Sequence, residues 1–152
     1  MTFTNRIEDQ MTPYPVTADP KMMVSEAAAL MKEKQIRHLP VLDAGKVVGI
    51  LSDRDARQAL ALPGAFQLMV GDVMHDQPYC VSVGTPLAEV AREMATRKIG
   101  SAVILSKHNK PVGIFTTTDA MAILAELLED GPEPESKWVG PIERYMQMGY
   151  VM

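Results

Sequence analysis

The feature that most constrains the fold is an internal repeat with a period of 63 or 64 residues. The segment Ile7–Met11 matches Val70–Met74 at an offset of 63 residues, and Gly49–Asp55 matches Gly113–Asp119 at an offset of 64. Two further pairs keep this frame: Glu26–Met31 with Glu89–Met94, and Ile36 with Ile99. Four matched segments at nearly the same offset predict two related half-domains. The change of offset from 63 to 64 indicates one residue inserted in the intervening turn.

Each half-domain carries a hydroxyl residue followed three positions later by an aspartate, after an apolar strand end. The residues are Ser52 and Asp55 in the first half, and Thr116 and Asp119 in the second. A helix that begins with such residues places polar side chains and unpaired backbone N–H groups at one edge of a sheet, which suits an anion or a ribose. Two such edges predict two related pockets. The same residues could instead serve only as a helix N-cap and a first-turn carboxylate.

Hydrophobic periodicity predicts the order β-α-β-β-α in each half, which is an α/β fold with one sheet packed against two helices. The first helix of each half is expected to begin at Ser25 and at Thr85-Pro86, before apolar residues at helical spacing. The closing helices are expected at about 53–62 and 118–128, where Pro-Gly and Gly-Pro pairs follow them. The predicted extended segments and hairpins cover residues 14–17, 39–51, 79–83 and 102–115.

The repeat and a change in composition divide the chain into three parts. We expect a first repeat over residues 1–69, a second over 70–130, and a C-terminal tail over 131–152. The tail begins with a proline-rich linker and then contains Trp138, Tyr145 and Tyr150 among several other apolar residues. Because a free tail would expose much apolar surface, we expect it to dock on its own domain or on a partner.

Composition excludes several classes of protein. The net charge of −4 is spread over both signs, and no basic patch for nucleic acid is visible. The apolar runs are too short to span a membrane. A single cysteine, Cys80, excludes an internal disulfide and fits a reducing cytoplasm. The histidines are scattered without metal-ligand spacing, and no Gly-rich phosphate loop or nucleophile with a base is evident, so an enzyme is the least favoured class.

Together, these segments resemble the CBS-domain pair, also called a Bateman module, over about residues 7 to 128. The resemblance rests on Met11-Thr12-Pro13, Glu26-Ala27-Ala28, the segment Ile36–Val41 and the segment Val48–Asp55, with their echoes in the second half. It implies two tandem β-α-β-β-α CBS repeats packed as a pseudo-twofold pair. It also implies an adenosine-containing regulatory ligand (AMP, ADP, ATP or S-adenosylmethionine) in clefts between the repeats, with no other cofactor.

The resemblance implies roles for individual residues. Asp55 and Asp119 correspond to carboxylates that bind ribose hydroxyls, and Ser52 and Thr116 to the hydroxyls beside them. Arg54 corresponds to a phosphate partner, since its planar guanidinium suits an anion. The walls around the base are implied to be Val16, Thr17, Arg37, His38, Leu39 and Pro40 in the first cleft, and Cys80, Val81, Ile99, Gly100, Ser101 and Ala102 in the second.

The second cleft departs from the first at two charged positions. Thr118 stands where the first half has Arg54, and Gly100 stands where it has Arg37. A charge-assisted hydrogen bond is roughly twice as strong as a neutral one. The first cleft is therefore expected to prefer phosphorylated adenosine, and the second to be empty, weaker, or filled by a ligand without phosphate. Lys98 is the nearby cation that could reduce this difference.

The chain shows no attached catalytic or DNA-binding domain, so its regulatory output is expected to reach a separate, unidentified protein. A homodimer is expected, because the closing helices carry more apolar surface than one small domain can bury. These apolar residues are Ala56, Ala59, Leu60, Met121, Ile123, Leu124, Leu127 and Leu128. A dimeric scaffold with empty clefts is the alternative function, and nucleotide binding would separate the two.

Overall fold

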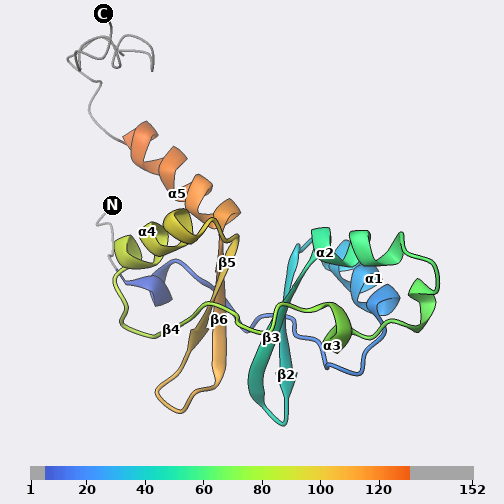
Figure 1. Ribbon diagram of the computed structural model, residues 1–152. Helices are drawn as coiled ribbons and strands as arrows, with labels where there is room; N and C mark the ends of the chain where they lie inside the picture. The colour runs from blue at the N-terminus through green and yellow to red at the C-terminus, as the bar shows by residue number, and fades with distance from the viewer. Residues whose placement is uncertain (1–5, 131–152) are drawn as a thin grey trace, which may run out of the picture. The chain divides into compact units, whose positions relative to one another are not determined.

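The computed structural model describes residues 6–130, which contain five α-helices, two 3-10 helices and six strands (Figure 1). The chain divides into two units between Met121 and Ala122, inside the last helix, and both sequence repeats lie mainly in the first unit. The predicted tail, with Trp138, Tyr145 and Tyr150, lies outside the described residues. Between residues 6 and 130, no helix is both long enough and apolar enough to cross a membrane.

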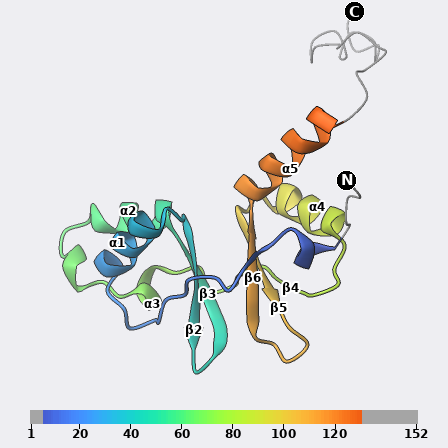
Figure 2. The same ribbon diagram turned by 180° about the vertical axis from the view of Figure 1, so that it is seen from behind.

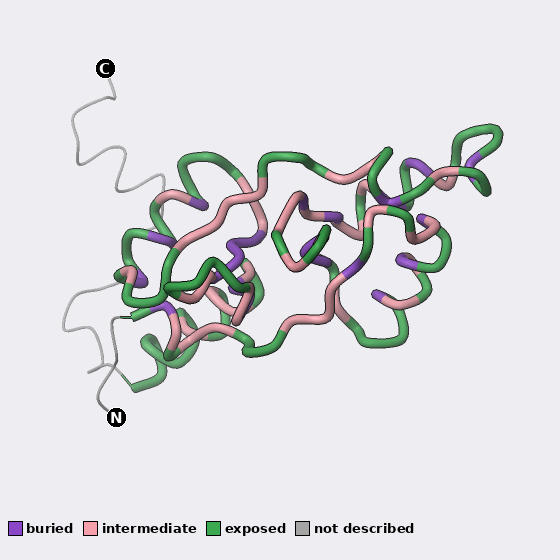
Figure 3. Tube along the Cα trace, turned by 90° about the horizontal axis from the view of Figure 1, so that it is seen from below, coloured by how far each residue is buried: buried purple, intermediate pink, exposed green. Residues whose placement is uncertain are grey.

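The first repeat consists of two helices and an antiparallel hairpin. Helix α1 spans Val24–Lys34, strand β2 spans His38–Asp43, strand β3 spans Lys46–Ser52, and helix α2 spans Asp53–Leu60. Along α1, the buried residues Val24, Ala27 and Met31 recur at helical spacing, so one side of the helix is buried. Figure 3 shows the chain coloured by burial. The α-β-β-α part of the predicted order is therefore confirmed for the first repeat.

The second repeat has the full predicted order β-α-β-β-α. Strand β4 spans Cys80–Ser82, helix α4 spans Leu87–Arg97, strand β5 spans Ser101–Leu105, strand β6 spans Pro111–Thr116, and helix α5 spans Thr117–Asp130. Strand β4 runs parallel to β5, and β5 pairs antiparallel with β6. This α/β arrangement confirms the predicted fold class.

The extended segment predicted at residues 14–17 is not a strand, and a proline explains the difference. The first repeat keeps one isolated parallel bridge here, between Ala18 and Val41. The next hydrogen bond of a parallel ladder would need the N–H of residue 40, and Pro40 has none. In the second repeat Val103 occupies this position, and its N–H donates to the carbonyl of Tyr79 at 2.8 Å. The ladder therefore extends into strand β4 only in the second repeat.

The predicted helix starts are shifted by one or two residues. Helix α1 begins at Val24 with Met23 as its N-cap residue, so the predicted cap at Ser25 is wrong. Helix α4 begins at Leu87, and Pro86 is the cap residue rather than part of the first turn. Neither cap residue accepts a side-chain hydrogen bond. Here the backbone entering each helix is held by other segments of the chain.

Those other segments are exchanged between the repeats. The N-terminal 3-10 helix η1, Ile7–Asp9, and strand β1, Thr12–Pro13, precede the first repeat in sequence but pack on the second. The N–H of Ile7 donates to the carbonyl of Thr85 at 3.0 Å, and β1 pairs with β6 in a sheet of order β1-β6-β5-β4. Figures 1 and 2 both show this blue segment beside α4 and β6.

The exchange is reciprocal. The linker between the repeats contains the 3-10 helix η2, Ala65–Gln67, and helix α3, Val70–Val73, and it packs on the first repeat. The N–H of Val70 donates to the carbonyl of Met22 at 2.7 Å. His75 and Ile50 exchange two backbone hydrogen bonds of 2.9 and 3.0 Å. These contacts repeat, at the period of the sequence, those of Ile7 and β1 with the second repeat.

A methionine and a glycine make the same contact on each side of this exchange. A Cβ atom at Gly113 would collide with the side chain of Met11, and one at Gly49 would collide with the side chain of Met74. Both glycines are buried in the strands that receive the exchanged segments. The repeated glycine therefore marks a close approach that any larger residue would obstruct.

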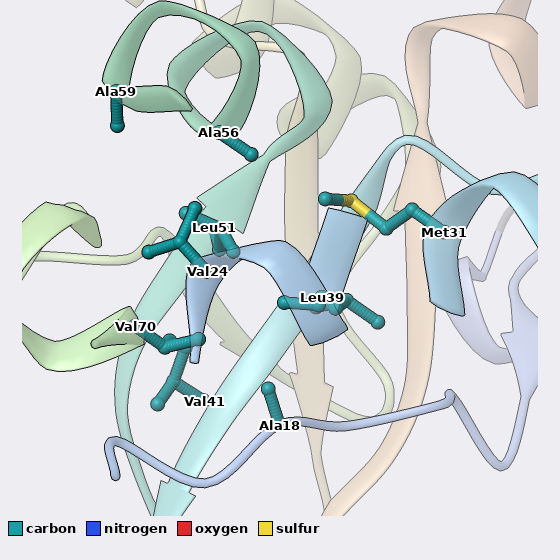
Figure 4. Close-up of a cluster of buried hydrophobic side chains, with 10 residues drawn as sticks. Ala18, Val24, Met31, Leu39, Val41, Leu51, Ala56, Ala59 and Val70 are labelled. Carbon is teal, nitrogen blue, oxygen red and sulfur yellow. The ribbon is translucent and has the colours of Figure 1, made fainter. Parts of the chain in front are cut away.

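The hydrophobic core of the first repeat includes a residue from the linker. Figure 4 shows Val70 of α3 beside Val41 of the hairpin, together with Val24, Leu39 and Leu51. All five side chains are fully buried. Because Val70 completes this core, the first repeat depends for its packing on a segment that lies beyond it in sequence.

Candidate functional site

Both hydroxyl-x-x-Asp motifs lie where a hairpin opens into the closing helix. In the first repeat, β3 ends at Ser52 and pairs there with His38. In the second repeat, β6 ends at Thr116 and pairs there with Ser101. The strand geometry therefore brings the residues predicted around the base next to the residues predicted at the ribose.

A backbone hydrogen bond holds each helix start in place. The N–H of Asp53 donates to the carbonyl of Arg37 at 2.8 Å, and the N–H of Thr117 donates to the carbonyl of Gly100 at 3.1 Å. These two bonds occupy equivalent positions in the repeats. Each satisfies one N–H group at the helix start.

The two motifs line one continuous cleft of about 1470 Å³ within the first unit, instead of the two separate clefts expected. Pockets for small molecules commonly measure about 300–1,000 Å³, so this cleft can hold a nucleotide. The predicted site residues that line it are Val16, Arg37, His38, Ser52, Arg54, Asp55, Ile99, Gly100, Thr116, Thr118 and Asp119.

The remaining predicted residues do not line the cleft: Thr17, Leu39, Pro40, Cys80, Val81, Ser101 and Ala102. Leu39, Pro40 and Ala102 are buried in the hairpins. Ser101 is also buried, whereas Thr17, Cys80 and Val81 are half-buried. Burial raises the pKa of the Cys80 thiol, which fits a packing role for this side chain.

The cleft also contains Gln35 and Arg57, which the sequence analysis did not assign, and Lys98, which it named only as a further cation. Lys98 ends helix α4 in the left-handed conformation, and Gln35 ends α1 in the same way at the equivalent position. Arg57 lies on α2 and pairs with Asp53 at 3.0 Å. Gln35 and Lys98 stand directly before Ile36 and Ile99, which match each other in the repeat. This equivalence is the sequence signal that could have identified Gln35 and Lys98 as related site residues.

Cations outnumber their partners in the cleft. Arg37, Arg54, Arg57 and Lys98 line it, and among residues 6–130 only Arg57 of these four forms an ion pair. Arg37, Arg54 and Lys98 are therefore available to an anionic ligand. Lys98 supplies the second repeat with a cation that the motif positions themselves lack.

The two motifs differ in how they use their aspartates. In the first repeat, the N–H of Asp55 donates to Oγ of Ser52 at 3.0 Å, and no described residue donates a hydrogen bond to the Asp55 carboxylate. In the second repeat, Oδ2 of Asp119 accepts from the N–H of Thr116 at 2.8 Å and from its hydroxyl at 3.0 Å. The Asp119 carboxylate thus caps its own helix, whereas that of Asp55 keeps both oxygens for a ligand.

His38 of the first repeat lies against the second. A Cβ atom at Gly100 would lie 3.1 Å from Nε2 of His38, so the imidazole occupies the space that a side chain at position 100 would need. Burial lowers the pKa of His38, and the Arg37 cation lowers it further, although Asp53 and Asp55 act in the opposite direction. The imidazole is therefore neutral at pH 7 and can serve as a donor and an acceptor.

Comparison with known proteins places these features in a family. The family model for the CBS domain matches residues 6–62 and 70–126. The CBS domain-containing protein YhcV of Bacillus subtilis is 31% identical over 114 residues, which cover 74% of this chain and 81% of YhcV. The L-aspartate semialdehyde sulfurtransferase of Methanocaldococcus jannaschii is 28% identical over 114 residues, 74% of this chain, but the match spans 22% of that enzyme.

Two similar solved structures contain adenosine compounds. The CBS domain pair of protein MJ0100, in complex with 5′-methylthioadenosine and S-adenosyl-L-methionine, is 26% identical with a TM-score of 0.74, and the match covers 82% of this chain and 98% of that chain. CBSX2 of Arabidopsis thaliana in complex with AMP is 26% identical with a TM-score of 0.71, and the match covers 82% of this chain and 98% of that chain.

Proposed function

Because the chain belongs to the CBS-domain family, we propose that it is a regulatory module that binds an adenosine-containing ligand in its cleft and signals to a separate protein. One observation carries the proposal. The unengaged carboxylate of Asp55 and the unpaired cations Arg37, Arg54 and Lys98 line the same cleft. A carboxylate accepts hydrogen bonds from two ribose hydroxyls, and cations bind phosphate oxygens.

The ligands of the similar structures support adenosine as the common part. AMP, 5′-methylthioadenosine and S-adenosylmethionine share adenine and ribose and differ at the 5′ position. In this chain the cleft is lined by Arg37, Arg54 and Lys98, which form no ion pair within residues 6–130. We expect an anionic 5′ group to bind more tightly than a sulfonium, so AMP, ADP or ATP is favoured over S-adenosylmethionine.

The proposal assigns no catalytic role. The match to the sulfurtransferase spans 22% of that enzyme, so the activity in its name is not assigned to this chain. Within residues 6–130, no group of three or more His, Cys, Asp and Glu residues is arranged to hold a metal ion. The residues of the cleft instead offer binding chemistry: carboxylates, hydroxyls and guanidinium groups.

Titration calorimetry with AMP, ADP, ATP and S-adenosylmethionine tests the proposal. We expect heat from at least one ligand below millimolar concentration, which corresponds to about −4 kcal/mol or better. The same ligand should raise the melting temperature, because it binds the folded state. The variant Asp55→Ala removes a proposed ligand contact. It should bind the same ligand more weakly and remain folded. No heat from any of the four ligands at millimolar concentration would leave the empty-cleft scaffold as the function.

We also propose that the chain forms a homodimer. Helix α5 has no buried residue, and its apolar side chains Met121 and Leu128 are 63% and 73% exposed. In the equivalent helix α2, by contrast, Ala56 and Ala59 are buried within the repeat. An exposed apolar helix face favours association with a second copy.

Light scattering at micromolar concentration should give twice the mass of the chain, and Leu128→Glu should shift that mass toward the monomer. A monomeric mass for the wild type contradicts the dimer.

A further inference from the structure

We propose that the two hairpin turns form one basic surface that binds an acidic segment of a separate protein. The turns are residues 43–46 of the first repeat and 106–110 of the second. This inference rests on the proposed regulatory function, because it locates the surface through which the module would reach its partner. The evidence is the contact between the turns, their fixed conformation and their charge.

The two turns lie together although they belong to different repeats. A Cβ atom added to Gly45 would lie 3.2 Å from Nζ of Lys110, so the ammonium group of the second turn reaches the backbone of the first. Figures 1 and 2 both show the free ends of the β2–β3 and β5–β6 hairpins pointing the same way. The cations of the two turns therefore belong to one surface.

Backbone geometry holds these turns in place. In the second turn, Oγ of Ser106 accepts from the N–H groups of His108 and Lys110, both at 3.2 Å, and the N–H of Ser106 donates to the carbonyl of Lys110 at 2.8 Å. In the first turn, Asp43 pairs with Lys46 across a two-residue loop in which both residues have positive φ, a common and tight hairpin connection. A surface whose backbone is already fixed loses less entropy when a partner binds.

The turns are positively charged, whereas the chain as a whole is negative. Lys46, Lys107 and Lys110 are exposed, and the two turns contain one acidic residue, Asp43. The whole chain has a net charge of −4, so the turns oppose the sign of the remainder. None of the three lysines forms an ion pair within residues 6–130. The surface is therefore complementary to a cluster of carboxylates.

An acidic protein segment fits this surface better than a nucleic acid does. Nucleic-acid surfaces typically use arginine and aromatic residues, and residues 43–46 and 106–110 contain neither. The negative remainder of the chain also repels a phosphate backbone. The turns lie at the opposite ends of the hairpins from Ser52 and Thr116 and do not line the cleft. A partner bound at the turns therefore leaves the cleft open to its ligand.

Fluorescence anisotropy with a labelled polyglutamate peptide tests the surface. We expect the wild-type protein to bind the peptide at low ionic strength and to lose it as salt rises, because salt screens exposed charges. The double variant Lys107→Glu, Lys110→Glu should bind it about tenfold or more weakly, and Lys46→Glu should also weaken it. Lys21→Glu combined with Lys34→Glu is the matched control, because it makes the same change in net charge on exposed residues outside the turns. This control should change the affinity about twofold or less.

Equal losses in the double variant and in its control overturn the inference, because the peptide then responds to net charge alone. An oligothymidylate of equal charge that binds more tightly than the peptide overturns the assignment to an acidic protein.

Calorimetric titration with AMP separates this inference from the proposed function. The double variant should bind AMP as the wild type does. A wild-type protein that binds AMP but not the peptide contradicts the surface alone, and one that binds the peptide but not AMP contradicts nucleotide sensing alone. If the double variant does not fold, the single exposed substitution Lys46→Glu decides the question: unchanged peptide affinity in that variant contradicts a surface shared by both turns.

Discussion

The two hydroxyl-x-x-Asp motifs have the same spacing, yet the protein uses them differently. Ser52 caps its helix through its hydroxyl, and no residue between 6 and 130 donates a hydrogen bond to the carboxylate of Asp55. In the second motif the carboxylate of Asp119 accepts two hydrogen bonds from Thr116. The comparison teaches that a repeated motif specifies a repeated local shape. How much binding capacity remains depends on how each copy satisfies its own backbone.

Two further differences point in the same direction. Pro40 leaves the Val16 carbonyl without a partner, whereas Val103 satisfies the carbonyl of Tyr79. Arg54 in the first motif becomes Thr118 in the second. The first repeat therefore has a main-chain carbonyl that no described residue bonds and a cation, and the second repeat has neither at the equivalent positions. The exchanged segments, by contrast, make equivalent contacts on both sides.

The largest effect is expected where the repeats are alike. Gly49→Ala and Gly113→Ala should each lower the free energy of unfolding by about 1–3 kcal/mol, because the added methyl group meets Met74 or Met11 in a packed contact. Urea denaturation measures both. Combining Gly113→Ala with Met11→Ala should recover part of the loss, since the space is vacated. If only one of the two substitutions lowers the free energy of unfolding, the two methionine–glycine contacts are not equivalent.

The next effect concerns phosphate binding in the cleft. Arg54→Ala should weaken AMP by roughly ten- to a hundredfold and adenosine much less, because the proposed role of the guanidinium is to bind the phosphate. Thr118→Ala, at the equivalent position, should change both affinities little. Calorimetric titrations of the two variants with AMP and adenosine make the comparison. Equal losses for AMP and adenosine in Arg54→Ala would refute a phosphate role for that residue.

A smaller effect separates the two aspartates. Asp119→Ala removes a reciprocal helix cap and should lower the free energy of unfolding by about 0.5–2 kcal/mol. Asp55→Ala should cost less stability, because its carboxylate accepts no hydrogen bond from residues 6–130, and should weaken ligand binding more. Urea denaturation and AMP titration of both variants give the two readouts. The distinction between the motifs fails if both variants lose stability and affinity alike.

The smallest effect is a pH dependence that belongs to the first repeat alone. Burial lowers the pKa of His38 below its ordinary value of about 6.5. The unfolded chain then binds the proton more tightly, so stability is full above about pH 6.5 and falls as the pH drops toward the folded pKa. His38→Gln should flatten this part of the unfolding profile, and Ser101→Ala should leave it in place. An unchanged profile in His38→Gln would place the titrating group elsewhere.

The sequence by itself determined the local structure of both repeats. The spacing of apolar residues predicts α1 and α4, because the buried face of an amphipathic helix appears in the sequence as apolar residues three or four positions apart. The strand-to-helix transitions at Ser52 and Thr116 are predicted by cap chemistry, which acts over three residues and appears directly in the structure. Ten of the predicted site residues that line the cleft lie at those transitions or at the strand ends beside them, and the eleventh, Val16, lies in the segment before α1.

Only the tertiary structure decided which segments meet. Thr12 pairs with Ile114 and His75 with Ile50, so the segment before each repeat completes the other one. The same packing merges both motifs into one cleft and sets His38 against Gly100. A periodic pattern records that a face is buried, but it carries no information on which distant segment covers that face. Whether an aspartate keeps its carboxylate for a ligand likewise depends on the side-chain arrangement of the folded motif.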